Sequence, residues 1–151
     1  MKIDIVQVEL SRKGSIDLNS IDGYAYGVET AQAIFVQQIG KCNVEVVALI
    51  CLDHTNKIIN YSNVAIGTMK LAKVSLAQIF KVALLSNADK LIIAHNHPSG
   101  VLNITQADID ITKNIANIAK LFEIELLDSI IVNSCGEVLS IRENIKELGK
   151  K

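Results

Sequence analysis

Strand-like apolar segments alternate with amphipathic helical segments along most of this chain, and no other feature restricts the fold as much. The strands are predicted at Val44–Leu52, Lys57–Ile66, Lys90–Ala94, Glu125–Val132 and Val138–Ile141. The helices are predicted at Val28–Gly40, from Ser75 to about Asn87, from Thr105 to Phe122, and at Glu143–Leu148. An alternation of this kind is typical of an α/β fold with a mixed central sheet.

The length of the chain predicts one domain, and its charge bears on the kind of partner. The chain has 151 residues, half of them apolar, and carries 15 Lys and Arg against 16 Asp and Glu. We expect residues 25–151 to form the domain and residues 1–24 to be an N-terminal extension, whose packing the sequence leaves undecided. Because phosphate binding needs clustered basic residues, the balanced charge argues against a nucleic acid as partner.

The number of cysteines and the hydropathy of the chain indicate in which cellular compartment the protein is expected. The three cysteines, Cys42, Cys51 and Cys135, are an odd number in a core-rich chain, which argues against a disulfide framework. No apolar run approaches the roughly 20 residues of a membrane-spanning helix. The first residues lack the pattern of a signal peptide. These observations together predict a cytoplasmic protein.

The segment from His95 to Asp108 holds the densest group of chemically active side chains. In an extended backbone, side chains two positions apart point to the same side, so His95 and His97 can converge on one point. Pro98, the only proline of the chain, favours an extended backbone at His97. Two imidazoles and the Asp108 carboxylate would leave the fourth position of a tetrahedral zinc open to water, as in catalytic zinc sites.

Simpler roles for these residues stay open at this point. The segment Thr105–Asp108 also has the pattern of a helix capping box, in which Asp108 would only support the start of the helix. The two histidines can equally be polar loop residues without a metal. The third histidine, His54, lies in the polar turn between the first two strands and is predicted to be exposed and uninvolved.

A water activated by a metal also needs a base. Glu45 is the best candidate because it stands at the head of Val46–Leu52, the most apolar strand. The alternative is that Glu45 is a solvent-exposed glutamate at a strand end.

In their order, these residues resemble the JAMM signature of JAB (MPN-plus) metalloproteases: an upstream Glu, then H-x-H, then S-x-x-D. The matching positions are Glu45, the segment His95–Gly100 (HNHPSG) and the segment Thr105–Asp108. The strings HNHPSG and LLDSIIV, the latter at Leu126–Val132, are similar to the RadC-like branch of bacterial JAB domains. The resemblance covers residues 25 to 142.

The resemblance implies a cytidine-deaminase-like three-layer α/β/α sandwich that holds one zinc ion per chain. By position, His95, His97 and Asp108 would be the zinc ligands and Glu45 the general acid and base. Thr105 stands where the family has a serine that helps to hold the water or the oxyanion, and it keeps the hydroxyl. The implied reaction is hydrolysis of a peptide or isopeptide bond in a protein substrate.

Two other functions compete with hydrolysis. One is a non-catalytic JAB binding module, and the other is a DNA-repair or mobile-element-associated RadC-like factor. Longer RadC-like proteins carry a helix-hairpin-helix region ahead of the JAB domain, and residues 1–24 show no matching glycine-hairpin pattern. Together with the balanced charge, this gives the DNA-related function little support from the sequence.

Overall fold

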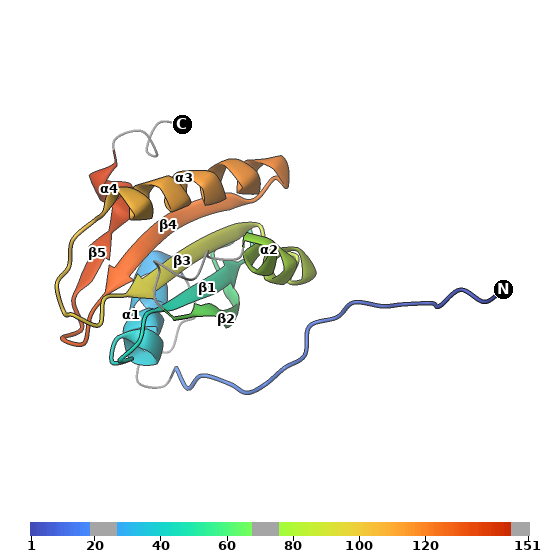
Figure 1. Cartoon of the computed structure of the whole chain (residues 1–151), viewed down its shortest axis with the longest axis horizontal. Coiled ribbons are helices and arrows are strands. Elements are labelled where there is room, and N and C mark those ends of the chain that lie inside the picture. The colour runs from blue at the N-terminus through green and yellow to red at the C-terminus, as the bar shows by residue number, and fades with distance from the viewer. Residues whose placement is uncertain (19–26, 68–75, 146–151) are drawn as a thin grey trace.

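The computed structural model of the chain describes residues 1–18, 27–67 and 76–145. Helices and strands alternate through most of the described part (Figure 1). The helices are α1 (Gly27–Ile39), α2 (Leu76–Leu85), α3 (Gln106–Leu121) and α4 (Ile141–Asn144). The strands are β1 (Val46–Leu52), β2 (Ile58–Ile66), β3 (Lys90–Asn96), β4 (Glu125–Val132) and β5 (Val138–Ser140).

All these strands belong to one mixed sheet, in the order β2-β1-β3-β4-β5. β1 is antiparallel to both β2 and β3, and β4 is antiparallel to β5. β3 and β4 are parallel and are connected through α3, which lies along β4 (Figure 1). The predicted α/β class with a mixed sheet is therefore confirmed.

The side chains of β1 divide the core into two layers. Val47, Leu49 and Cys51 pack in a cluster with residues of α2 and α3, whereas the even-numbered residues of β1 pack in a second cluster with α1. In β3, Leu91 and Ile93 likewise belong to the first cluster. One face of the sheet is thus covered by α1 and the other by α2 and α3, as expected for strands buried on both sides. The finer likeness to cytidine deaminases stays a prediction.

Several predicted boundaries differ from the structure. β3 continues two residues past Ala94, because its last residues still pair with β4. The last strand ends at Ser140, whose hydroxyl accepts a hydrogen bond from the Glu143 amide and caps α4. The predicted helix at 143–148 is therefore wrong at its start, since α4 spans Ile141–Asn144, and its end lies outside the described residues. Ser75, the predicted cap of α2, also lies outside them.

The inward-facing residues predicted for α3 are mostly confirmed. Ile115 is buried, and Ile111 and Ile118 pack against the same core cluster. Phe122 is the exception, because it follows the last helical residue and is 46% exposed. Its ring still contacts Phe80 of α2, with 5.6 Å between the ring centroids.

Residues 1–18 have no helix or strand and extend away from the body (Figure 1). Only Ile16 and Leu18, at the end of this segment, pack against the α1 side of the core. The three cysteines are free thiols in the structure. Among the described helices, none combines the length and the hydropathy needed to cross a membrane.

A buried carboxylate anchors α4 to the sheet. The Asp128 carboxylate of β4 accepts hydrogen bonds from the Ser140 hydroxyl at 2.7 and 2.9 Å and from the Ser129 amide at 2.7 Å. It also accepts one from the Arg142 amide at 3.3 Å. Burial raises the pKa of Asp128, and the nearby charge of Glu143 adds to the rise, although these hydrogen bonds oppose it.

We expect the free energy of unfolding of Asp128→Asn to increase relative to that of the wild type as the pH rises from about 4 toward neutral. A carboxyl whose pKa is raised by folding loses stabilising free energy between its unfolded pKa of about 3.9 and its folded pKa, whereas Asn does not titrate. Urea unfolding at both ends of this range measures the difference. Asp128→Ala should show the same pH dependence from a lower baseline. If the free energies of unfolding of Asp128→Asn and the wild type differ by the same amount at every pH, the raised pKa of Asp128 is contradicted.

Candidate metal centre

The register of β1 against β3 brings Glu45 and the histidines together. The antiparallel ladder pairs Val47 with His95, so continuing it by two residues places Glu45 opposite His97. Opposite residues in a ladder share a face of the sheet. Val47 packs on the α2 and α3 side, so the side chains at positions 45, 95 and 97 belong to the face that α3 covers.

The ligand atoms converge at this end of the sheet. Glu45, His95 and His97 each offer a ligand atom, and these atoms all lie within 4.8 Å of one another. The Nε2 atoms of the two histidines are 3.1 Å apart. Two nitrogen ligands at the usual zinc distance of about 2.0–2.1 Å, separated by the tetrahedral angle, lie about 3.3 Å apart. The histidine pair therefore has the spacing of two ligands on one metal ion, and the Glu45–His95–His97 group can hold one.

The ring of His97 is oriented by its second nitrogen. Its Nδ1 lies 2.9 Å from the Val101 carbonyl oxygen. Because a carbonyl can only accept, Nδ1 carries a proton, and in the neutral ring Nε2 then has the lone pair that a metal needs. Two hydrogen bonds hold the loop that runs from His97 to Val101. The His97 amide donates to the Val132 carbonyl, and the Asn133 side chain donates to the Gly100 carbonyl at 3.0 Å. In metal-binding histidines, the ring nitrogen that does not bind the metal commonly donates to such a carbonyl.

Asp108 makes two contacts at once, one with each carboxylate oxygen. Oδ2 accepts a hydrogen bond from the Thr105 amide at 2.9 Å, which completes a capping box at the start of α3. Oδ1 lies 3.3 Å from His95 Nε2, again close to the spacing of neighbouring zinc ligands. Asp108 therefore supports the cap and also faces His95, so the two roles left open by the sequence do not exclude each other.

The environment of Asp108 keeps it ionised. The side chain is 2% exposed. Burial raises the pKa of its carboxyl, but the hydrogen bonds with His95 and with the Thr105 amide outweigh this effect and lower the pKa to about 2. The side chain is therefore a carboxylate at neutral pH, which is the form that binds a metal, and a metal on His95 Nε2 would replace the hydrogen bond from His95.

Thr105 is the N-cap residue of α3. Its hydroxyl oxygen accepts a hydrogen bond from the Asp108 amide at 3.2 Å, and the residue is exposed at the surface. The predicted start of this helix is therefore confirmed. The catalytic role of the Thr105 hydroxyl stays a prediction, as do the separate roles of base and metal ligand assigned to the other four residues.

We expect Thr105→Ala to lower the free energy of unfolding of the metal-free protein by about 1 kcal/mol, because one N–H of the first turn loses its acceptor. Thr105→Ser keeps the hydroxyl and should retain most of that stability. Urea unfolding of both variants in the presence of a chelator measures the effect. Equal stability of Thr105→Ala and the wild type would mean that the cap contributes nothing.

Two polar residues lie outside the predicted site, and the exposure of His54 is as expected from the sequence. His54 lies in the turn between β1 and β2 with its side chain 82% exposed. Asp110, two residues after Asp108, is exposed on α3 and accepts a hydrogen bond from the Gln106 side chain. Neither belongs to the Glu45–His95–His97 group.

The partners that orient the site were missed by the sequence analysis. A backbone carbonyl such as that of Val101 leaves no sequence signal, because every residue has one. Asn133 could have been suspected, since an Asn immediately before a turn often hydrogen-bonds to nearby backbone groups. Its contact with Gly100, 33 residues away, depends on the parallel pairing of β3 and β4.

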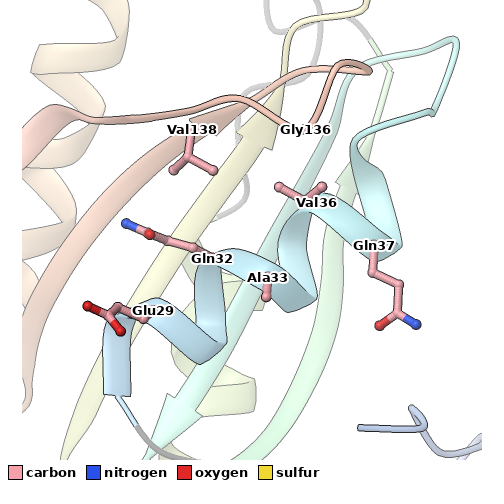
Figure 2. A pocket seen from close by; sticks show the side chains of 7 residues that line it. All are labelled: Glu29, Gln32, Ala33, Val36, Gln37, Gly136 and Val138. Carbon is pink, nitrogen blue, oxygen red and sulfur yellow. The ribbon is translucent and has the colours of Figure 1, made fainter. Parts of the chain in front are cut away.

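A hollow of about 500 Å³ lies elsewhere on the molecule, between α1 and the turn from β4 to β5 (Figure 2). Val36 of α1 and Gly136 of the turn lie close together among the residues that line it. It is lined by Glu29, Gln32, Ala33, Val36, Gln37, Gly136 and Val138. Because no residue of the candidate metal centre lines it, we do not assign it to the same chemistry.

Comparisons with known proteins agree with the geometry. A family model described as RadC-like JAB domain matches residues 26–147. The chain is 34% identical to the UPF0758 protein of Finegoldia magna over 139 residues, which are 91% of this chain and 61% of the relative. It is 40% identical to the UPF0758 protein of Acidithiobacillus ferrooxidans over 66% of this chain and 44% of the relative.

A UPF0758 protein of Haemophilus influenzae is 35% identical over 78% of this chain and 52% of the relative. The chain thus spans about half the length of these curated relatives. Their names state no activity, whereas the family match confirms the resemblance found in the sequence.

Proposed function

Since the chain belongs to the RadC-like JAB domain family, we propose that it is a zinc-dependent hydrolase that cleaves a peptide or isopeptide bond. In this proposal His95, His97 and Asp108 hold one zinc ion per chain, and Glu45 is the general base and acid. A protein carrying an amide or isopeptide linkage is the proposed substrate.

One observation carries the proposal, which is the clustering of a second imidazole nitrogen and a carboxylate oxygen around His95 Nε2. The Nε2 atoms of His95 and His97 are 3.1 Å apart, and His95 Nε2 lies 3.3 Å from Asp108 Oδ1. Two imidazoles and a carboxylate suit zinc, and three protein ligands are the number found in catalytic zinc sites. The residues present therefore fit the metal that the family resemblance implies.

When bound, zinc would act as a Lewis acid that polarises a carbonyl and brings the pKa of water near 7. The Glu45 carboxylate stands within 4.8 Å of both histidine nitrogens, so it is placed to take a proton from an attacking water. The same carboxyl then gives a proton to the leaving amine. We further propose that the Thr105 hydroxyl stabilises the developing oxyanion.

The metal is tested first, by elemental analysis of protein produced without a histidine tag. We expect about one zinc per chain in the wild type and none in His95→Ala. Iron or manganese in place of zinc would correct the identity of the metal. If no stoichiometric metal binds, even after zinc is supplied, the hydrolase proposal fails and a binding module on the same fold becomes the better description.

The reaction is tested on peptide mixtures and on model isopeptides in which a lysine Nζ carries an acyl-peptide. Hydrolysis in ¹⁸O-labelled water marks each new carboxylate, so mass spectrometry detects cleavage without knowledge of the natural substrate. At a zinc concentration that saturates both proteins, Glu45→Gln should hold zinc and lose about 100-fold or more of the rate, within the range expected for a general base. Cleavage that is equal in Glu45→Gln would exclude Glu45 as the base.

A further inference from the structure

Asn96 lies between the two histidines and points to the other side of the sheet. Side chains alternate along β3, and the even-numbered residues Ile92 and Ala94 pack in the core cluster on the α1 side. Asn96 continues this row and is 0% exposed. A carboxamide buried so completely must satisfy its hydrogen bonds within the protein.

The carboxamide of Asn96 makes three hydrogen bonds, all with the segment that carries Glu45. Its Oδ1 accepts from the Val46 amide at 2.7 Å. Its Nδ2 donates to the carbonyls of Cys42 at 3.1 Å and Val44 at 3.0 Å. The Val44 carbonyl and the Val46 amide belong to the two peptide groups on either side of the Glu45 Cα. One side chain therefore holds both peptide groups of Glu45.

These contacts continue the ladder between β1 and β3 past its last backbone pair. The described pairing ends at Val47 and His95, and the next pair in register would be Val46 and Asn96. On the other side, the Glu45 carbonyl accepts a hydrogen bond from the Gly67 amide at 2.8 Å, just beyond β2. The backbone of Glu45 is thus fixed from both neighbouring strands, and Asn96 provides the link to the histidines.

We propose that Asn96 is the positioning residue that fixes Glu45 relative to the His95–His97 pair. This inference rests on the proposed function, because it gives Glu45 a task at the metal. Asn suits the position chemically, since one carboxamide supplies the acceptor for Val46 and two donors for the carbonyls. An apolar side chain supplies none of these groups, and Asp would place a carboxylate against two carbonyl oxygens.

The test is a double-mutant cycle on zinc affinity, measured by competition with a chromophoric chelator. Changes outside the ligand set typically alter metal affinity about 10–100-fold. We therefore expect Asn96→Leu and Glu45→Gln each to weaken zinc binding about tenfold. If Asn96 acts through Glu45, the double variant binds zinc no more weakly than Glu45→Gln alone. Equal effects of Asn96→Leu in both backgrounds, or no effect in either, would overturn the inference.

Asn133→Leu is the matched control. Asn133 is also a buried asparagine, 1% exposed, but it contacts the loop after His97 rather than the segment of Glu45. Its effect on zinc affinity should be the same with Glu45 and with Gln at position 45. Asn96→Ser, which leaves room for water, replaces Asn96→Leu if the larger apolar side chain prevents folding.

A measurement on the metal-free protein separates this inference from the proposed function. Amide hydrogen exchange followed by NMR should show that Asn96→Leu or Asn96→Ser removes the protection of the Val46 amide, while the amides of β3 before His95 stay protected. A wild type without zinc affinity would refute the proposed function alone. Unchanged protection of Val46 would refute the positioning role of Asn96, whether or not zinc binds.

Discussion

Replacing His97 with Ala is expected to abolish stoichiometric zinc binding and to lower zinc affinity more than 100-fold. Its Nε2 lies 3.1 Å from that of His95, and its Nδ1 is engaged by the Val101 carbonyl. Partners outside the ligand set already change affinity about 10–100-fold, so the loss of a ligand should exceed that range. Chelator competition measures the affinity, and elemental analysis measures the stoichiometry.

Thermal unfolding gives an independent measurement of the same prediction. A free zinc concentration 100 times the dissociation constant should stabilise the wild type by about 2.7 kcal/mol, because zinc binds the folded state. The same zinc concentration should leave the free energy of unfolding of His97→Ala almost unchanged. The matched control is His54→Ala, which removes an imidazole that is 82% exposed in the turn after β1. If His97→Ala and His54→Ala are equally stabilised by zinc, His97 is not a ligand.

Two substitutions of Asp108 should separate its contribution to the helix cap from its contribution to metal binding. Asp108→Asn keeps an oxygen that can accept from the Thr105 amide but loses the negative charge that faces His95. Asp108→Ala loses both. We expect zinc affinity to fall more than 100-fold in both variants. Both variants should also lose stability without metal, because the lowered pKa of Asp108 means that the folded state favours its charged form. Asp108→Ala should lose about 1 kcal/mol more than Asp108→Asn, from the broken capping box.

Asp110→Asn is the control for this pair, because Asp110 is exposed on the same helix and accepts a hydrogen bond from Gln106 of that helix. It should change neither zinc affinity nor the stability of the metal-free protein by more than about 0.5 kcal/mol. Normal zinc binding by Asp108→Asn would restore the simpler hypothesis, in which Asp108 serves only the cap of α3.

The parts of the site that the sequence predicted are those that depend on local periodicity. The two-residue spacing of His95 and His97 placed both side chains on one side of an extended segment, and the structure shows them with their Nε2 atoms 3.1 Å apart. The pattern Thr105–Asp108 predicted a helix start, and the capping box is present. Both features involve residues a few positions apart, whose relation is set by the backbone conformation alone.

Glu45 could be predicted as a candidate but not located. Its position at the head of an apolar strand does not say which strand it faces, and 50 residues separate it from His95. The resemblance to the JAMM signature selected it, and the antiparallel register of β1 and β3 then put it opposite His97. The errors at the end of the chain have a similar origin, because Ser140 changes from strand to helix cap where it meets Asp128.

The sequence by itself thus determined the α/β class and most of the strands and helices, and its resemblance to the JAMM signature named Glu45, His95, His97 and Asp108 as candidates for one site. Only the tertiary structure decided how they meet. It showed that Asp108 uses one oxygen for the cap and the other toward His95, and that Asn96 holds the segment of Glu45. These contacts join residues far apart in the chain, and they depend on strand register and burial, which no local pattern of residues encodes.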